Sequence, residues 1–536
     1  MNNVYIKNIV NIFNPTPIGK RRFSMYDAII IGSGIGGMTC GALLAKNGLK
    51  TLIIEQHSRP GGYVTSYKRK GFTFDVVHVI GGLRKDAPLE RVFTYLGMDK
   101  KVTFKEVDKT FRYVYPDMNL NCWTDIDRYE EELVRHFPTE EKGIKLYIQT
   151  SKRIWKEILS SYYHPTTLQF LSYPFRFPHL VRYQNATHQE LLDQFISDGK
   201  LKEILGSGWG YLGLNNRKVS ALYMVGMYMS YHAGGAWYPK GGYQAMSDAF
   251  AERFRELGGT LRLGTRVKKI STDQRRVYGV ELETGEVVKG ERVISNADTK
   301  RTFLELMGAD AIGRTFAANI QGLEQSVSGL VVHLGINKEL PRDLHCGCIM
   351  VCPEYGVADH QFSLSEDGRI EEGVGKFGFG LSVASLKDPT VAPPGCHAID
   401  LIYMPAPHQY NNGWLREDKE QYEHLKARLA DNLIKAAEKI IPDLVQHIIV
   451  KDISTPLTYE RYTGATGGGR YDVACTPKQS SLNRSPATTP IKNLYLTGAK
   501  SFPGPGMFGA VQSGLFTADT ILRKKLTKGA YVLGGR

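Results

Sequence analysis

Six residues near the start of the chain have types and a spacing that fit dinucleotide binding. Gly32, Ser33, Gly34, Ile35, Gly36 and Gly37 form the turn G-x-G-x-x-G. In such a turn the first glycine permits a tight bend, the second lets the backbone approach a pyrophosphate, and the third lets a helix pack closely on a strand. Glu55, eighteen residues after Gly37, supplies a carboxylate that can accept hydrogen bonds from ribose hydroxyls.

The elements around these residues follow the order that such a site requires. The apolar run from Ala28 to Ile31 predicts a strand before the turn, and Met38 to Lys46 predicts a small-residue helix after it. Thr51 to Ile54 predicts a second strand, which ends at Glu55. The N-terminus of the helix would offer unsatisfied N–H groups and a partial positive charge to the phosphates. We therefore expect a Rossmann-like dinucleotide site.

The loop after Glu55 indicates which dinucleotide binds. It contains Gln56, Arg59, Gly61 and Gly62. A basic residue and a Gly-Gly pair just past the ribose acid resemble the second motif of the two-dinucleotide-binding-domain flavoproteins, in which this loop wraps FAD. No second G-x-G-x-x-G with its strand and helix occurs later in the chain, so a separate NAD(P) domain is not expected.

Further segments extend the resemblance over about residues 26–525. They resemble the G-F-x-F-D, Y-P-x-G-G, D-P-x-x-A-P-P-G and glycine-rich C-terminal blocks of the phytoene desaturase family, and they are Gly71–Asp75, Trp237–Gly242, Leu386–Gly395 and Asn493–Gly509. This family includes carotenoid desaturases, carotenoid isomerases and retinol saturases. The resemblance implies an α/β fold in which a discontinuous Rossmann-like FAD-binding domain joins an α+β substrate-binding domain.

The resemblance also implies more FAD-binding residues. Val267 belongs to a strand that passes the adenine, Asn296 ends another strand, and the last group lies beside the isoalloxazine ring: Gly498, Gly506, Met507 and Phe508. A helix of about 506–522 begins at this corner, and its N-terminus would stabilise negative charge on the reduced flavin. We expect the first glycine turn and this closing Pro-Gly corner to meet around the cofactor.

The predicted domains alternate along the chain. Residues 1–24 form an N-terminal extension and 526–536 a C-terminal tail. The FAD-binding domain comprises 25–105, 235–300 and 450–525, and the substrate-binding domain comprises 106–234 and 301–449.

The implied reaction is hydride transfer at flavin N5 on a carotenoid- or retinoid-like polyene. Such a substrate has no polar handle, so a long hydrophobic tunnel must position it. Desaturation and saturation remain open, and cis–trans isomerisation by the same flavin is an alternative. His78, Tyr238 and Lys240 are candidates for groups near the reacting carbon. The family often has Arg where Lys240 stands, a change that keeps the charge but loses a bidentate fork.

Two other function classes remain. A flavin oxidase of amines or porphyrin-like substrates would release peroxide and would have a more polar pocket. A non-redox escort protein for prenylated partners would bind lipid without FAD. Gly32, Gly34, Glu55 and Arg59 argue against this class, because a carrier needs no pyrophosphate cradle.

Composition narrows the partners and the location. The formal net charge of +14 suits an anionic membrane, anionic ligands or nucleic acid, but without a zinc-finger or RNA-binding signature we expect no nucleic acid. Seven cysteines, an odd number, favour a reducing, cytoplasmic compartment. The oligomeric state stays open. Cys346, Cys348 and Cys352 lack a standard zinc spacing, so no metal is expected.

Two aromatic stretches each have two interpretations. Thr167 to Gln184 mixes aromatic and basic residues, which suits peripheral contact with a membrane surface or a loop that covers the substrate domain. Tyr223 to Ala233 is rich in Met and aromatic residues, which fits either the wall of an apolar cavity or plain core.

Overall fold

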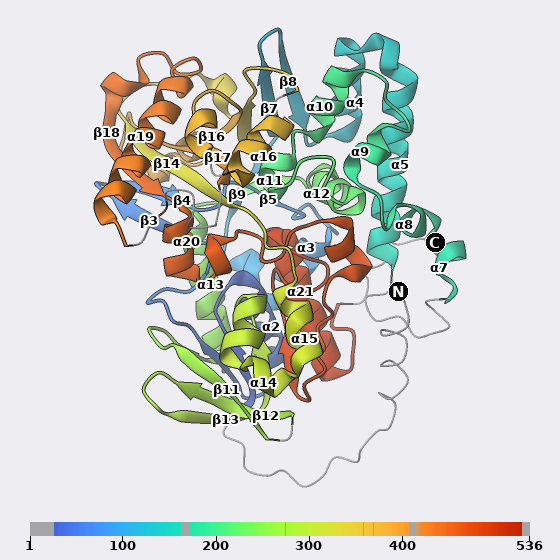
Figure 1. Cartoon of the computed structure of the whole chain (residues 1–536), viewed down its shortest axis with the longest axis vertical. Helices are drawn as coiled ribbons and strands as arrows, with labels where there is room; N and C mark the ends of the chain where they lie inside the picture. The colour runs from blue at the N-terminus through green and yellow to red at the C-terminus, as the bar shows by residue number, and fades with distance from the viewer. Residues whose placement is uncertain are drawn as a thin grey trace.

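The computed structural model describes residues 26–527 apart from 162–170, 274, 357, 368, 407–413 and 415–416. Within these residues the chain forms two seven-stranded sheets, one in the lower and one in the upper half of Figure 1. The predicted extension 1–24 and most of the predicted tail, 528–536, lie outside the described residues.

The first sheet carries the dinucleotide motif. Its parallel strands are β10 (Thr260–Arg262), β2 (Thr51–Ile54), β1 (Tyr26–Ile31), β13 (Val287–Ser295) and β19 (Leu494–Leu496). Two antiparallel strands extend it, β12 (Arg276–Leu282) and β11 (Val267–Asp273). Ala28 and Ile30 of β1 pack into one core, and Ile29 and Ile31 pack into another. Because both faces of β1 are covered, its sequence is a continuous apolar run.

Three helices pack together beside this sheet: α2 (Ile35–Lys46), α13 (Tyr243–Glu256) and α21 (Gly506–Leu522). The range of α21 is the predicted one, whereas α2 begins three residues earlier than predicted because Gly36 and Gly37 belong to its first turn. A Cβ atom on Gly514 would lie 2.7 Å from the Gly36 carbonyl oxygen, so small residues let α21 approach α2 closely.

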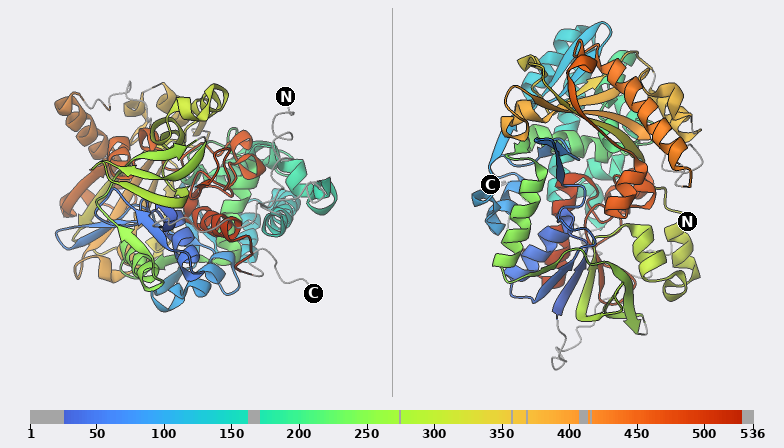
Figure 2. Two further views of the ribbon diagram at one scale, coloured as in Figure 1. Left: turned by 90° about the horizontal axis from the view of Figure 1, so that it is seen from below. Right: turned by 90° about the vertical axis from the view of Figure 1, so that its left-hand side faces the viewer.

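The second sheet lies above the first in the right-hand view of Figure 2. Its order is β18 (Ile448–Ser454), β14 (Ser328–Ile336), β17 (His397–Ala406), β16 (Phe379–Val383), β15 (Cys348–Val351), β7 (Lys109–Tyr115) and β8 (Met118–Trp123). The predicted helical face on α19 (Lys419–Ala437) packs on alternate residues of β14, including Leu330 and Val332. The side chains at the other alternate positions of β14 and β17 point away from α19, to the opposite face of the sheet.

Shorter strands and the remaining helices complete the fold. The small sheets are formed by β3 (Ser66–Arg69) with β4 (Phe72–Asp75), and by β5 (Ile80–Gly81), β9 (Ala236–Pro239) and β6 (Phe104–Val107). The longer helices are α4 (Ile126–His136), α5 (Glu141–Ser160) and α12 (Ala221–Gly234). The shorter helices are α3 (Pro88–Leu96), α7 (Tyr173–Arg176), α8 (Pro178–Tyr183), α9 (His188–Leu192), α10 (Gly199–Gly206), α11 (Trp209–Leu212), α14 (Ala309–Ile312), α15 (Arg314–Gln321), α16 (Ala358–Glu366), α17 (Ile370–Gly373), α18 (Ala384–Lys387) and α20 (Pro456–Thr463).

One predicted domain boundary falls inside a strand. The first sheet draws its strands from the segments predicted for the FAD-binding domain, but β18 crosses the boundary at residue 450. Since β18 pairs with β14 along its length, it belongs with the second sheet. Among the described helices, none is both long enough and apolar enough to cross a membrane.

Candidate functional site

A cavity of about 1070 Å³ lies where the two sheets approach each other. Its wall includes the first turn of α2, the loop after β2, the start of α21, and residues of β17, β18 and α12. This volume slightly exceeds the range of about 300–1000 Å³ that is usual for ligand pockets. The cavity therefore has room for a large ligand.

Most of the predicted cofactor residues share this wall. They are Gly32, Gly34, Ile35, Gly36, Glu55, Gln56, Arg59, Gly61, Gly62, Val267, Asn296, Gly498, Gly506, Met507 and Phe508. Ser33 and Gly37 are not on the wall. Ser33 lies behind Glu55 and orients it, and Gly37 packs α2 against the turn, where a Cβ atom would collide with the Gly32 carbonyl oxygen.

Glu55 is held in one orientation at the end of β2. Its Oε2 accepts hydrogen bonds from the backbone N–H and the hydroxyl of Ser33, both at 2.8 Å, and its Oε1 accepts one from the His57 N–H, also at 2.8 Å. A carboxylate offers about four acceptor positions. A position thus remains for a ribose hydroxyl.

Asn296 fills the space between the two glycine corners. A Cβ atom on Gly34 would lie 2.7 Å from Asn296 Nδ2, and one on Gly498 would collide with Asn296 Oδ1. A Cβ atom on Gly36 would lie 2.6 Å from the Gly498 Cα. The first glycine turn and the closing corner are therefore in contact, as the sequence predicts.

Two helix N-termini open onto the cavity. Gly34 caps α2 and Pro505 caps α21 without a side-chain hydrogen bond, and the first turn of each helix lacks an acidic residue. The N–H groups of these first turns have no intrahelical partner and favour anions. Together with the held Glu55 carboxylate, this donor set fits the pyrophosphate, the ribose and the electron-rich ring of FAD.

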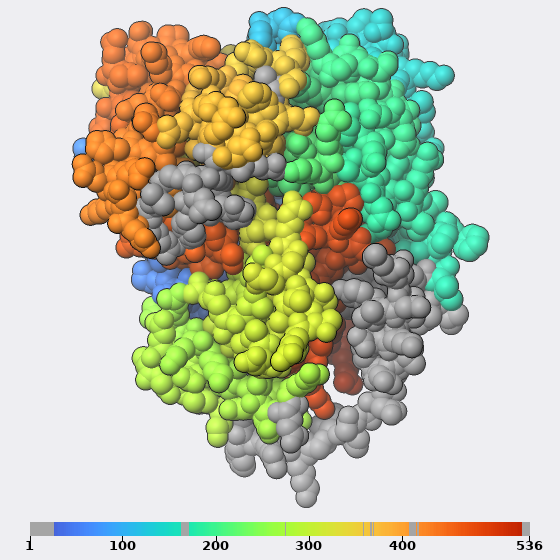
Figure 3. Space-filling view, viewed as in Figure 1, coloured from blue at the N-terminus to red at the C-terminus, as the bar shows by residue number. Residues whose placement is uncertain are grey.

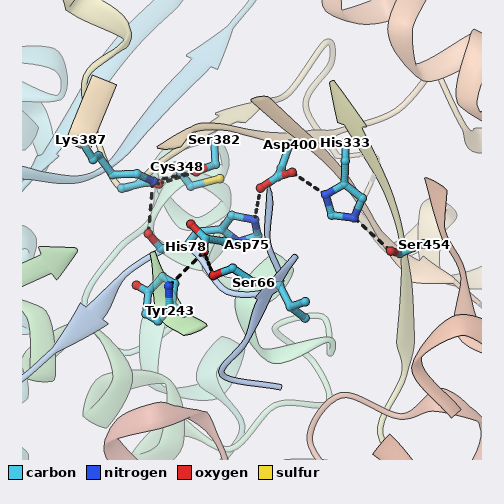
Figure 4. Close-up of polar contacts among 12 residues, drawn as sticks. Ser66, Asp75, His78, Tyr243, His333, Cys348, Ser382, Lys387, Asp400 and Ser454 are labelled. Carbon is cyan, nitrogen blue, oxygen red and sulfur yellow. Dashed lines mark hydrogen bonds and ion pairs between the residues drawn. The ribbon is translucent and has the colours of Figure 1, made fainter. Parts of the chain in front are cut away.

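A buried chain of polar side chains connects two residues of the wall, His78 and Ser454 (Figure 4). His333 on β14 and Asp400 on β17 are direct cross-strand partners, and His333 Nδ1 lies 2.6 Å from Asp400 Oδ1. His333 Nε2 lies 3.0 Å from the Ser454 hydroxyl, and Asp400 Oδ2 lies 3.2 Å from Nε2 of His78. His78 and Ser454 both line the cavity, so both ends of the chain reach it.

The electrostatics of this chain favour an ionised acid between two imidazoles. Burial by itself would raise the pKa of Asp400, but His333 and His78 hold that pKa far below its usual range. Burial lowers the pKa of His78, Asp400 opposes this shift, and the cations Lys387 and Arg470 add to it. The His78 imidazole is therefore neutral at neutral pH and can accept a proton.

Lys387 fixes the backbone behind His78. Its Nζ donates to the His78 carbonyl at 3.2 Å, to the Gly347 carbonyl at 3.2 Å and to the Ser382 hydroxyl at 2.8 Å. Burial lowers the pKa of this amine. The amine thus ties the loop that carries His78 to β15 and β16.

A comparison with family models assigns the class. Residues 35–522 match the model described as flavin containing amine oxidoreductase. The chain belongs to this family.

Relatives within and around this family share nearly the whole length of the chain. The chain is 27% identical over 513 residues to a phytoene desaturase (lycopene-forming) of Pseudescherichia vulneris, covering 93% of this chain and 99% of the relative. It is 27% identical over 518 residues to a chloroplastic prolycopene isomerase of Daucus carota, covering 94% and 81%. These matches confirm the predicted resemblance to carotenoid desaturases and isomerases, the FAD cofactor and the class of FAD-dependent oxidoreductase.

A solved structure confirms the fold class. The cyclohexylamine oxidase from Brevibacterium oxydans IH-35A superposes with a TM-score of 0.58 at 16% identity, over 93% of this chain and 99% of that protein. At this identity the likeness concerns the fold alone, a Rossmann-like FAD-binding part joined to a second mixed sheet.

Only one of the three predicted catalytic residues lies on the cavity wall, and this is His78. Tyr238 is fully buried away from the wall and donates a hydrogen bond of 2.5 Å to Asp75, whose pKa burial raises to about 6. Lys240 is exposed and also lies off the wall. We therefore assign neither Tyr238 nor Lys240 to the reacting centre.

The Met- and aromatic-rich residues of α12 contribute both to the cavity wall and to the core. Tyr223, Met227 and Tyr231 line the cavity, whereas Met224 is buried in core. Cys346 and Cys348 are buried beside Lys387. Within the described residues, no group of His, Cys, Asp or Glu is arranged to hold a metal ion.

Sequence reasoning missed several residues of the wall and of the polar chain behind it. They are His333 and Asp400 in the buried polar chain, and Ser454, Arg470 and Trp155 on the wall. The sequence did contain a signal for His333 and Asp400, because each is a polar residue inside a mostly apolar strand. These strands are GLVVHLGI and HAIDLIYM. Such a residue on a buried strand must find a partner. The partner itself follows only from the register between β14 and β17.

Proposed function

We propose that this protein is an FAD-dependent oxidoreductase that desaturates or saturates a carbon–carbon bond of a carotenoid- or retinoid-like polyene. The observation that carries this proposal is one continuous cavity with two kinds of wall. One part is formed by the first glycine turn and the closing corner, which together are called the glycine cradle. Another part is apolar and includes Trp155, Ile158, Leu212, Leu222, Ile402 and Met404. Bound FAD accepts or donates a hydride at N5.

Residues of this chain would hold FAD along the cradle. Glu55 would accept hydrogen bonds from the ribose, the N-terminus of α2 would bind the pyrophosphate, and the N-terminus of α21 would face the flavin ring. The apolar wall would exclude water and align the polyene by its shape.

His78 is the group on this wall that would handle the proton. Its neutral imidazole would take the proton that leaves the carbon next to the oxidised one, and in the direction of saturation its protonated form would give that proton back. Asp400, 3.2 Å from His78 Nε2, would orient the ring and stabilise the imidazolium. The Lys387 amine holds the His78 backbone in place.

Isomerisation is a second candidate, because a prolycopene isomerase is among the similar proteins and needs the same cavity. The apolar wall favours a polyene over an amine. The intact cradle speaks against a lipid escort without a cofactor.

The test is an anaerobic single-turnover experiment with FAD-loaded protein and a panel of polyenes. We expect the flavin absorbance to change with a polyene, and chromatography to show a product altered by two hydrogens. His78→Ala should slow this step by about 100-fold, the usual range for loss of a general base. Lys240→Ala is the matched control and should react like the parent. A flavin that responds to amines and to no polyene would overturn the proposal.

We also propose peripheral contact with an anionic membrane through α7 and α8. These helices project at the right-hand edge of the molecule in Figure 3. Phe175 of α7 is 88% exposed, and Leu171, just before α7, is 64% exposed. Arg176 and Arg182 lie on the same two helices. On α8, Leu180 lines the cavity while the neighbouring Val181 is exposed, so a thin part of the wall separates the cavity from this surface.

A further inference from the structure

Arg470 is a cation on the cavity wall, and no ion pair joins it to another described residue. Its Nη2 donates a hydrogen bond of 2.8 Å to the Val76 carbonyl, and its Cζ lies 5.1 Å from the centre of the Tyr459 ring. Among the residues that the structure describes, no carboxylate forms an ion pair with this guanidinium. Its remaining N–H groups are available to a ligand.

Three acids on or behind the cavity wall are already engaged by other groups. Asp400 faces the two imidazoles. Asp472 accepts hydrogen bonds from the N–H and hydroxyl of Thr299, at 2.9 and 2.6 Å. Asp298 accepts one of 2.7 Å from the Thr466 hydroxyl. Tyrosines surround the guanidinium instead: Tyr63, Tyr459, Tyr471 and Tyr211. A partly buried cation that lacks a counter-charge favours the binding of an anion.

Arg470 is hydrogen-bonded to the loop that carries His78. The carbonyl that it binds belongs to Val76, two residues before His78 in the loop between β4 and β5. Both side chains line the cavity. A ligand whose charged end reaches Arg470 would place the adjoining carbons near His78, while its chain lies against the apolar wall.

We propose that the polyene carries a carboxylate at the end that enters the cavity, and that Arg470 binds this carboxylate. The inference rests on the proposed function and deepens it, because it supplies the polar handle that a hydrocarbon lacks. A guanidinium and a carboxylate form charge-assisted, often bidentate hydrogen bonds, which are the strongest available to this side chain. The carbonyl oxygens of the flavin ring are the other acceptors that could reach the same group.

The test compares three C20 polyenes that differ only at one end: all-trans-retinoic acid, retinol and the hydrocarbon axerophthene. Their binding to FAD-loaded protein is followed by quenching of tryptophan fluorescence, since Trp155 lines the cavity. We expect the acid to bind at least about 10-fold more tightly than the hydrocarbon, the usual gain from a hydrogen bond to a charged group. Arg470→Gln should abolish this preference, and Arg470→Lys should keep part of it.

Arg69→Gln is the matched control. Arg69 also lies at the cavity, but it pairs with Asp452 at 3.3 Å, so its loss should leave the preference for the acid unchanged. The affinity of each variant for FAD is measured in parallel by flavin fluorescence.

Three outcomes are decisive. Equal affinity of the parent protein for all three polyenes overturns the inference, and this comparison needs no variant that must fold. A weaker affinity of Arg470→Gln for FAD with an intact preference for the acid assigns Arg470 to the flavin and also overturns it. Binding of the acid through Arg470 without any change in the flavin supports the inference and refutes the proposed reaction instead.

Discussion

The cradle and the polar wall of the cavity are built in different ways. The cradle uses backbone groups and glycines that stand close together in the sequence, as in the turn from Gly32 to Gly37. The polar wall uses single side chains from distant segments, such as His78, Ser454 and Arg470, and Asp400 supports His78 from behind. The cradle leaves no room for a Cβ atom at Gly36, Gly37 and Gly498 and needs few side chains, whereas the wall depends on side-chain identity. Substitutions in the first region should therefore act on folding and FAD binding, and substitutions in the second region should act on the chemistry as well.

The largest effect should come from the cradle. Gly37→Val would push side-chain atoms into the Gly32 carbonyl and toward Asn296. We expect the free energy of unfolding to fall by about 3 kcal/mol or more and the purified protein to lose its flavin absorbance. Gly48→Ala is the control, because its backbone φ is also positive, at 84°, but a Cβ atom would meet nothing within 4 Å. It should cost about 1 kcal/mol and keep FAD. A yellow, stable Gly37→Val protein would refute this difference between the two glycines.

Asp400→Asn should affect both stability and reaction. It removes the negative charge between His333 and His78, and we expect a loss of about 2 to 3 kcal/mol in urea unfolding. Because His78 would lose the charge that stabilises its protonated form, flavin reduction in a single turnover should slow by at least about 10-fold. Asp452→Asn, whose carboxylate is partly exposed, should change neither strongly. An unchanged rate in Asp400→Asn would remove this acid from the proton path.

A buried histidine far from the cavity should affect stability alone. Burial lowers the pKa of His188 to about 4, against about 6.5 in the unfolded chain. As the pH falls below 6.5, the unfolded state takes up the proton first, so the stability that neutral His188 contributes above pH 6.5 is lost toward pH 4.

Between pH 7 and pH 5, His188→Gln should therefore lose about 2 kcal/mol less than the parent in urea unfolding. Asp75 and Asp472, whose pKa values burial raises to about 6, act in the opposite direction in both proteins, so the comparison cancels them. The exposed His424 offers a control, and His424→Gln should follow the parent. Parallel pH curves for His188→Gln and the parent would contradict the expected burial effect.

The smallest effect should lie on the outer surface. Phe175→Ser removes a highly exposed ring from α7, and we expect about 10-fold weaker co-sedimentation with vesicles that contain anionic lipid. Val445→Ser, at another exposed apolar position, should bind like the parent. Equal binding of the two variants would exclude α7 as the contact surface.

The sequence predicted the cradle well because its geometry is local. The strand at Thr51–Ile54 and the helix at 506–522 agree with β2 and α21, since hydrophobic runs and glycines fix such elements directly. The start of α2 was placed too late because glycines were assigned to the turn rather than to the helix.

The polar wall was predicted only at His78. Tyr238 stands in a motif that the resemblance identified, but its hydroxyl serves Asp75 inside the core. His333 and Asp400 meet because β14 pairs with β17 in one particular register, and the sequence alone does not fix that register. Arg470 follows a run of glycines, and nothing in the sequence there indicates which way its side chain extends.

The position of the Asn296 side chain between Gly34 and Gly498 has a consequence for biosynthesis. The cradle needs β1 and α2 from the beginning of the described chain, and β19 and α21 from its end. A ribosome must therefore release residues 494–522 before the pyrophosphate nest is complete. FAD capture should accordingly follow translation, and until then the nascent protein would depend on chaperones to shield the surfaces of α2 that α21 later covers.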